Sequence, residues 1–472
     1  MIKRVAIIGG GPGGIVAAKE CVAHGLQPTV FEKNASPGGV WNPDRGKVWQ
    51  SMHTNLSRHH MGFSDFPWPE DTQDFPHNTD VYRYLMSYID HFSLQDSFHY
   101  NQAIEQVSFE NNTWNVRHNG QEDTFDAAIL ASGVFSKGSI PPFKGLSDFQ
   151  GDTLHSQDYK ESVTFTNKKT LVVGSSFSAY EIASDLAKRD VEVTHVFHRP
   201  SWILNRFVND IPLDLASNNY MKLFILRENH FARNKRIEER FGNPGAVHPQ
   251  LMVESGSNKP VPVVISDDYL SGVTSKKIQP ARGTIDHFTA NGFELTDGRH
   301  HACDSVVFCT GFDMTIPYLG NSILETCHFD AKDNFQPLIL NKSTLHPAYP
   351  SLGFVGMYRG PYLPVMEMQA RWIAGTFSNA IAPPSKEAHE KALEDEWNIR
   401  LQHPQPQFPR SDYMGFMMEL AQEIGVVPTE LVNGFANKNP MLPCDFRRHG
   451  PGCTPELAKE TRDKALSCLY MS

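Results

Sequence analysis

The sequence predicts an α/β protein with two Rossmann-like dinucleotide-binding domains. Two observations carry this prediction: an apolar strand leads into a glycine turn and a helix directly after the N-terminus, and the same succession returns near residue 170. The length of 472 residues exceeds what one hydrophobic core usually organises, which agrees with two domains. Hydrophobic residues at 40% and charged residues at 20% indicate a folded globular protein and exclude disordered and fibrous classes.

The first nucleotide unit begins with Val5 to Ile8, a continuous apolar run typical of a strand buried on both faces of a parallel sheet. The turn Gly9 to Gly14 follows and fits the pattern G-x-G-x-x-G. Its first glycine permits a tight turn, its second lets backbone approach a pyrophosphate, and its third lets the helix pack on the strand. We predict this helix over Ile15 to His24, with its N-terminus pointing at the phosphates.

An acidic residue completes this unit. The second strand, Pro28 to Phe31, ends in Glu32, 18 residues beyond Gly14, where a carboxylate can accept hydrogen bonds from ribose hydroxyls. The alternative is a structural glycine loop without a ligand, and the order of strand, turn, helix and acid argues against it. An acid at this position favours FAD.

The second unit starts with the apolar strand Thr170 to Val173, continues through the turn Gly174 to Ala179, and enters a helix over Tyr180 to Lys188. Ser176 and Ala179 stand where the pattern has glycine, but small residues still allow close approach of the backbone.

The next strand of this unit, Glu192 to Phe197, ends in His198 and Arg199 rather than in an acid. A guanidinium at this place suits the 2′-phosphate of NADPH, because arginine pairs with phosphate through two hydrogen bonds. The alternative is an exposed arginine at the end of a strand. We therefore predict that the second unit binds NADPH in preference to NADH.

Charge and cysteine content exclude several other classes. The formal net charge of -10 argues against nucleic acid or an anionic membrane surface as the main partner. The seven cysteines are scattered and never form C-x-x-C, so neither a disulfide framework nor a zinc site is expected. Adjacent histidines, His59-His60 and His300-His301, point in different directions, and we expect no metal. Without a signal peptide or an apolar run of about 18 residues, a cytoplasmic protein is expected.

Two dinucleotide units in one chain imply either two bound dinucleotides or one dinucleotide and a decayed relic of a second site. With FAD and NADPH both bound, hydride would pass from nicotinamide to flavin. Disulfide reductases would need a redox cysteine pair, and the sequence has none. Oxygen is therefore the expected acceptor of the electrons of the flavin.

A motif between the two units gives a family resemblance. The segment Phe149 to Tyr159 fits F-x-G-x-x-x-H-x-x-x-Y at every specified position and resembles the identifying sequence of flavin-containing monooxygenases. The related Baeyer–Villiger monooxygenases carry tryptophan where this chain has Tyr159. The resemblance continues in further blocks along the chain, namely Gly38-Gly39-Val40-Trp41, Thr54-Asn55, Phe63-Ser64-Asp65-Phe66-Pro67, Ala131-Ser132-Gly133, Cys309-Thr310-Gly311-Phe312, Met368-Gln369-Ala370-Arg371-Trp372 and Arg448-His449-Gly450-Pro451-Gly452.

The resemblance implies a domain organisation. An NADPH-binding domain over 164–308 is inserted into an FAD-binding domain made of 1–163 and 309–472, and linkers resembling A-T-G, at Ala131 to Gly133 and Cys309 to Gly311, join the two. The stretch of about 208–275 resembles the insertion of the animal enzymes. Their C-terminal hydrophobic anchor has no counterpart, so no membrane anchor is expected, and a homodimer is left open.

The resemblance also implies a reaction. NADPH reduces FAD, the flavin adds oxygen to form a C4a-hydroperoxide, and a small-molecule nucleophile takes the distal oxygen at an amine nitrogen or a sulfur. The cofactor carries the difficult step, and the protein supplies position and polarity. Two alternatives stay open: a Baeyer–Villiger monooxygenase acting on ketones, and an FAD- and NADPH-binding redox protein that does not oxygenate.

Asn55 matches the family asparagine that supplies a donor near the flavin, and we expect it to be the catalytic residue. His155 of the motif is expected to be structural, and Phe149 and Tyr159 are expected to be core residues. The expected FAD-binding residues are Gly9, Gly11, Pro12, Gly13, Gly14, Glu32, Lys33, Gly39, Val40, Trp41, Thr54, Asn55, Ile104, Ser132 and Gln369. The expected NADPH-binding residues are Gly174, Ser175, Ser176, Ser178 and Arg199.

Overall fold

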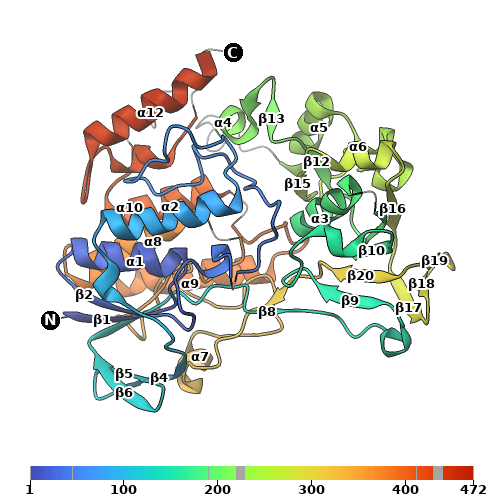
Figure 1. The fold of residues 1–472 in the computed structure, drawn as a ribbon. Coiled ribbons are helices and arrows are strands. Elements are labelled where there is room, and N and C mark those ends of the chain that lie inside the picture. Colours follow the sequence, from blue (N-terminus) through green and yellow to red (C-terminus); the bar gives the residue numbers. More distant parts are fainter. Residues whose placement is uncertain are drawn as a thin grey trace.

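Two parallel five-stranded sheets lie in opposite halves of the molecule (Figure 1). The structure is a computed structural model that describes residues 2–44, 46–189, 191–218, 229–360, 362–410, 412–428 and 440–470. Each sheet is built around one of the two apolar strands that precede a glycine turn. The predicted α/β class with two Rossmann-like units is confirmed.

The first sheet has the strand order β22-β7-β1-β2-β3. In that order its strands span Leu352–Phe354, Ala127–Leu130, Arg4–Ile8, Gln27–Phe31 and Phe98–His99. The central strand β1 pairs on both sides, with Ile7 opposite Val30 in β2 and Ile129 in β7. All three side chains are fully buried, as the apolar runs predict for strands covered on both faces.

Helices cover one face of this sheet and an antiparallel meander covers the other, which is why the run Val5 to Ile8 is apolar at every position. Val5 and Ile7 pack with the helices, whereas Ala6 and Ile8 pack with the meander. The helices are α1 (Pro12–Ala23), α2 (Asn78–His91), α8 (Leu363–Phe377) and α10 (Tyr413–Ile424). The meander is β4 (Ile104–Glu110), β5 (Thr113–His118) and β6 (Gln121–Phe125).

The second sheet repeats this plan, with the order β16-β11-β10-β20-β9. In that order its strands span Ile278–Arg282, Glu192–Phe197, Lys169–Val173, Ser305–Phe308 and Asp152–His155. Helices α3 (Phe177–Lys188) and α6 (Tyr269–Thr274) cover one face. The meander β17 (Ile285–Thr289), β18 (Gly292–Leu295) and β19 (His300–Ala302) covers the other.

Strand β9 shows that the chain enters the second sheet earlier than the expected boundary at residue 163. Its residues Asp152 to His155 pair in parallel with β20, so this strand lies in the second sheet although it precedes the boundary. The two connections between the units are joined by the short antiparallel pair of β8 (Lys137–Gly138) and β21 (Phe312–Asp313). The chain therefore enters the second sheet and leaves it through two neighbouring segments, which is the arrangement expected of an inserted unit.

An excursion leaves the second sheet after β11 and returns before β16. The parallel strands β12 (Trp202–Leu204) and β15 (Val263–Ile265) form its base. It also holds β13 (Phe207–Val208), β14 (Ile211–Pro212), α4 (Leu213–Ser217) and α5 (His230–Phe241). This stretch contains most of the insertion expected over 208–275, of which residues 219–228 lie outside the described residues.

The C-terminal part returns to the first unit, where α7 (Asn321–Thr326), α8 and α10 are joined by α9 (Lys386–Leu401) and α12 (Pro455–Tyr470). Helix α12 lies beside α4 of the excursion, because Leu215 packs with Leu442 and Ala458 (Figure 1). In the described parts of the chain, no helix is both long and apolar enough to cross a membrane.

Candidate functional site

The first glycine turn is so tight that two of its glycines cannot carry a side chain. A Cβ on Gly14 would lie 1.8 Å from the carbonyl oxygen of Gly9, and a Cβ on Gly9 would lie 2.7 Å from the carbonyl oxygen of Ala131. Gly9 also has a φ of +109°, which favours glycine. The turn is thus held between its own helix and the first linker, in the place expected from the sequence.

Both nucleotide helices begin inside their turns rather than after them. Helix α1 starts at Pro12 instead of Ile15, and α3 starts at Phe177 instead of Tyr180, because the small turn residues already adopt helical backbone. Neither start has a side-chain cap, although Ser176 stands at the cap position of α3. Side chains cap α2, α5, α9 and α10, whereas α4, α6, α7 and α8 have no side-chain cap either. Uncapped N–H groups at a glycine turn fit the pyrophosphate of a dinucleotide.

The G-G-x-W block lies directly on the first turn. The amide of Gly38 donates to the carbonyl oxygen of Gly10 at 2.8 Å, and a Cβ on Gly39 would lie 2.9 Å from Cα of Gly11. Val40 and Trp41 are half-buried in the short helical turn that follows. The block therefore forms a second wall of the cradle, which a side chain on Gly39 would fill.

The carboxylate of Glu32 reaches this cradle from the end of β2. It is 5% exposed and accepts hydrogen bonds from the amide of Gly10 at 2.7 Å and from both nitrogens of Asn34 at 2.8 Å. A carboxylate has about four acceptor positions, so capacity for a ribose hydroxyl is left. Among the other expected FAD residues, Lys33 is exposed beside Glu32, and the hydroxyl of Ser132 meets that of Tyr318 at 2.6 Å.

Two expected FAD residues have roles within the protein. Ile104 packs against the core cluster between the first sheet and the meander. Gln369 in α8 is fully buried, accepts from the amide of Gly356, and donates to Ser343 and Thr344. Both of its N–H groups are thereby occupied, which argues against the expected cofactor contact. Gln369 instead ties α8 to two loops of the first unit.

The second turn is built like the first. A Cβ on Gly174 would lie 2.4 Å from the carbonyl oxygen of Cys309, so this glycine abuts the second linker as Gly9 abuts the first. The hydroxyl of Ser175 lies 3.2 Å from Nδ1 of His198, and Ser176 and Ser178 are half-buried at the start of α3. Small residues and hydroxyls line the place where phosphate oxygens would lie.

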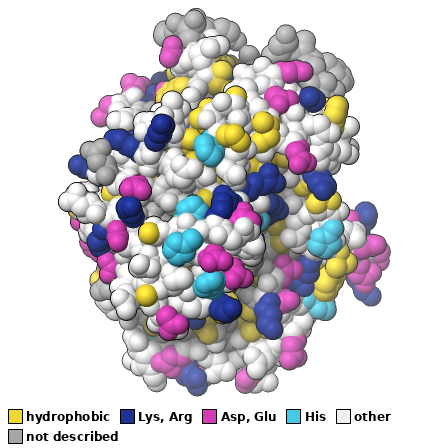
Figure 2. Space-filling view, turned by 90° about the vertical axis from the view of Figure 1, so that its right-hand side faces the viewer, with side chains coloured by type: hydrophobic (Ala, Val, Ile, Leu, Met, Phe, Trp, Pro, Cys, Tyr) yellow, Lys and Arg dark blue, Asp and Glu magenta, His cyan; other side chains and the backbone are white. Residues whose placement is uncertain are grey.

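Arg199 is exposed at the end of β11, as the sequence predicts. A second guanidinium, that of Arg359, comes close enough that partial burial and the charge of Arg199 lower the pKa of Arg359. Figure 2 views the molecule from the side of the second sheet and shows Lys and Arg side chains gathered near the middle of this face. Arg359 lies far along the sequence and carries no motif, so only the fold brings it beside Arg199.

Thr54 and Asn55 lie in a loop that faces the second unit. Thr54 is buried, and its amide donates to the carbonyl oxygen of Pro76 at 3.0 Å. Arg206 of the excursion donates through Nε to the carbonyl oxygen of Thr54 at 3.0 Å, and its Nη2 lies 3.5 Å from Oδ1 of Asn55. No sequence pattern marks Arg206, which lies between Asn205 and Phe207.

The F-x-G-x-x-x-H-x-x-x-Y motif holds the connection between the units. Nε2 of His155 bonds the carbonyl oxygen of Gly311 in the second linker at 2.9 Å, and burial lowers the pKa of His155. The hydroxyl of Tyr159 donates to Asp185 of α3 at 2.5 Å. Phe149 and Tyr159 are buried. These contacts support structural roles for all three motif residues.

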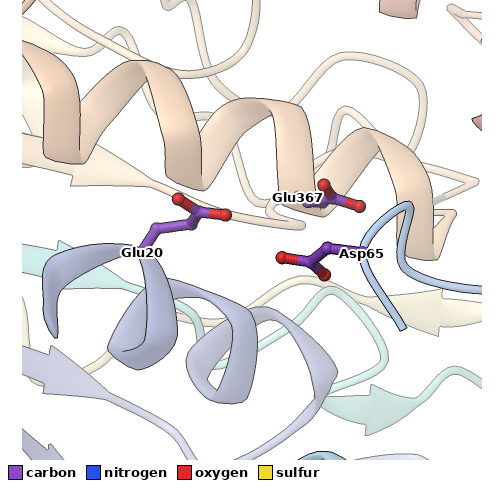
Figure 3. A group of neighbouring side chains, drawn as sticks. All are labelled: Glu20, Asp65 and Glu367. Atoms are coloured by element: carbon purple, nitrogen blue, oxygen red, sulfur yellow. The ribbon is translucent and has the colours of Figure 1, made fainter. Parts of the chain in front are cut away.

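A cluster of three carboxylates was not expected from the sequence. Figure 3 shows Glu20 of α1 and Glu367 of α8 turned toward Asp65 of the Phe-Ser-Asp-Phe-Pro block. Their oxygens lie within 4.8 Å of one another, a spacing that could hold a metal ion. Lys19 and Arg447 donate to these oxygens, with Arg447 2.7 Å from both glutamates. The cluster is therefore a buried ion-pair network in which Lys19 and Arg447, with Arg371 nearby, balance the three carboxylates.

Comparison with known proteins places these features in a family context. The flavin-binding monooxygenase-like family model matches residues 2–456. A Rattus norvegicus protein named dimethylaniline monooxygenase 2 (N-oxide-forming) is 30% identical over 487 residues, covering 96% of this chain and 90% of that protein.

Two solved structures share the fold. The S-allyl-L-cysteine S-oxygenase from Allium sativum has a TM-score of 0.65 at 21% identity, with 99% of each chain covered. A cyclohexanone monooxygenase bound to ε-caprolactone has a TM-score of 0.70 at 19% identity, with 92% of this chain and 98% of that chain covered.

Proposed function

The chain belongs to the flavin-binding monooxygenase-like family, and on this premise we propose that it oxygenates soft nucleophiles at nitrogen or sulfur. It is an NADPH-dependent oxidoreductase that uses FAD and molecular oxygen. When bound and reduced, FAD supplies the activated oxygen that an amine or a thioether accepts. The two glycine turns, the uncapped helices and Glu32 fit the two dinucleotides.

The observation that carries the choice of nucleophile is Tyr159. This residue ends the motif where the resemblance gives tryptophan to Baeyer–Villiger enzymes, and its hydroxyl bonds Asp185 at 2.5 Å. A hydroxyl of Ser51 bonds the other oxygen of Asp185 at 2.6 Å, so Tyr159 is part of a contact between the units. The name of the rat relative, an N-oxide-forming enzyme, supports the same choice.

We assign roles to the residues of the chain as follows. The turn Gly9 to Gly14 and Glu32 bind FAD, and the turn Gly174 to Ser178 binds the pyrophosphate of NADPH. Arg199 selects NADPH by pairing with its 2′-phosphate. The amide of Asn55, which is half-buried next to the buried Thr54, donates a hydrogen bond at the oxygenation site.

We further propose that these roles divide between two domains. Residues 1–163 and 309–472 form the FAD-binding domain, except that β9 belongs with the NADPH-binding domain of 164–308. His155 and the linkers then set the position of one domain on the other.

Product analysis with competing substrates tests the proposal. The purified protein is incubated with NADPH, isotopically labelled dioxygen and an equal mixture of a small thioether, a tertiary amine and a cyclic ketone. We expect labelled sulfoxide or N-oxide and no lactone. Lactone as the main product would establish the Baeyer–Villiger alternative. If each substrate is then tested alone and NADPH oxidation yields only hydrogen peroxide every time, the protein is a redox protein that does not oxygenate.

A further inference from the structure

Arg206 connects three parts of the molecule that are far apart in the sequence. It lies between β12 and β13 on the excursion of the second unit and is 7% exposed. Its Nη2 donates to Glu181 of α3 at 2.8 Å, and its Nη1 donates to Asp267 at 2.9 Å. Burial alone would lower the pKa of Arg206, but Glu181 and Asp267 raise it, so the guanidinium stays charged. The side chain is therefore held rigidly by its own unit while Nε reaches the loop of the other unit.

Arg206 contacts both the backbone next to the proposed catalytic residue and the side chain of that residue. The bond of 3.0 Å to the carbonyl oxygen of Thr54 fixes the chain directly before Asn55. The distance of 3.5 Å to Oδ1 of Asn55 is long for a hydrogen bond, so this contact selects an orientation rather than holding a position. A guanidinium can only donate, which means that it attracts the oxygen of the amide and repels its NH2 group.

We propose that Arg206 is a positioning residue that orients the amide of Asn55, so that its NH2 group is presented as a donor to the oxygenation site. The amide of asparagine can rotate by half a turn and exchange its oxygen for its nitrogen, and without a neighbour that only donates, both orientations are accessible. Arg206 removes one of them. This inference rests on the proposed function, because it concerns the NH2 group through which Asn55 is expected to donate a hydrogen bond at the oxygenation site.

A second contact from the same excursion holds the other end of the loop. Asp214 of α4 accepts from the amide of Ser57 at 2.7 Å, and its carboxylate lies 3.4 Å from Nδ1 of His60. Phe207 packs edge-on against Phe75 with ring centroids 5.0 Å apart. The loop that carries Asn55 is thus held at Thr54 and at Ser57 by the unit expected to bind NADPH. Since Glu181 lies on α3, the helix of the second glycine turn, the same guanidinium links that turn to Asn55.

The test compares R206M and R206K with R400M as a matched control. Arg400 is also a partly buried arginine that pairs with an aspartate, Asp333, and donates to backbone carbonyl oxygens, but it does so at the C-terminal end of α9. We expect R206M to lower the product formed per NADPH about tenfold, since a lost oriented donor costs about that much or more. FAD content and the KM for NADPH should change less than about twofold, and R206K should recover part of the loss because its ammonium still donates.

Two further measurements separate positioning from general damage. Hydrogen exchange of the cofactor-free protein should increase in residues 54–60 of R206M and not in R400M. The double variant N55A/R206M should lose no more coupling than N55A alone, because Arg206 acts through Asn55. Additive losses, unchanged exchange in the loop, or equal coupling in R206M and R400M would each overturn the inference. Absence of any oxygenated product from the native enzyme would instead refute the proposed function, while the exchange comparison would still test whether Arg206 holds the loop.

Discussion

Replacing Arg447 with methionine should destabilise the first unit in a way that depends on pH. Arg447 is 2% exposed and donates to Glu20 and Glu367 at 2.7 Å and to Asp65 at 3.1 Å. The network balances three carboxylates (Figure 3) against three cations, Lys19, Arg371 and Arg447. The variant R447M would leave a net negative charge in the core, while the methionine side chain would still fill most of the space that the arginine occupies. Its effect is therefore electrostatic rather than steric.

The expected loss follows from the burial of the network. Removing one partner of a buried ion pair costs about 3–5 kcal/mol of unfolding free energy, because the remaining charge is neither solvated nor paired. An unfolding entropy of about 2.1 cal/mol/K per residue amounts to about 1 kcal/mol/K for the whole chain. If the chain unfolds as one unit, Tm should fall by about 3–5 °C at pH 7.5.

The pH dependence identifies the cause. Burial alone would raise the pKa of Glu20, but Arg447 and Lys19 outweigh it and lower this pKa from 4.5 to about 2. Glu20 therefore stabilises the native protein above pH 4.5, and this contribution is lost as pH falls toward 2. In R447M the largest of the attractions that lower this pKa is gone, so less of this stabilisation remains above pH 4.5. The difference in Tm between native protein and variant should thus be larger at about pH 7.5 than at about pH 3, where the contribution of Glu20 is partly lost.

Thermal unfolding followed by circular dichroism at both pH values is the assay. K464M is the control, because Lys464 pairs with Glu70 on the surface, where both side chains are mostly exposed. We expect it to leave Tm almost unchanged at either pH. A loss in R447M that is no larger than in K464M, or that is equal at both pH values, would refute the electrostatic argument.

Three further predictions concern the nucleotide sites. G14A should yield protein without bound FAD, because its Cβ would lie 1.8 Å from a backbone oxygen, whereas G256A, with nothing within 4 Å, should keep a full complement of FAD measured by absorbance. R199A should raise the KM for NADPH about tenfold or more, since one charged hydrogen-bonded pair is worth about 1.5–3 kcal/mol, and should leave the KM for NADH within about twofold. R189A, which replaces another exposed arginine, is the control. Equal rises for both cofactors in R199A, or a rise in R189A similar to that in R199A, would place the 2′-phosphate elsewhere. N55D should raise the yield of hydrogen peroxide per NADPH, because a carboxylate cannot donate, and an unchanged yield would remove Asn55 from the site.

Local patterns were sufficient for the two nucleotide units. A glycine turn, the strand before it and the charged residue after the next strand lie within about 30 residues, so their relative positions follow from the geometry of one strand-helix-strand unit. Glu32 and Arg199 accordingly lie at the strand ends where the sequence predicts them. The starts of α1 and α3 were displaced by three residues, because turn glycines and serines adopt helical backbone although they are weak helix formers.

Contacts between distant segments were decided by the tertiary structure alone. Arg206 meets Thr54 across 152 residues, and Arg447 meets Glu20 across 427. Strand β9 joins the second sheet because its pairing partner β20 lies much later in the chain. A lone arginine or a short strand has no periodicity to reveal its partner, and the partner is fixed only when both units have packed. The sequence thus determined which cofactors the turns suit, whereas the fold decided which side chains surround and orient Asn55.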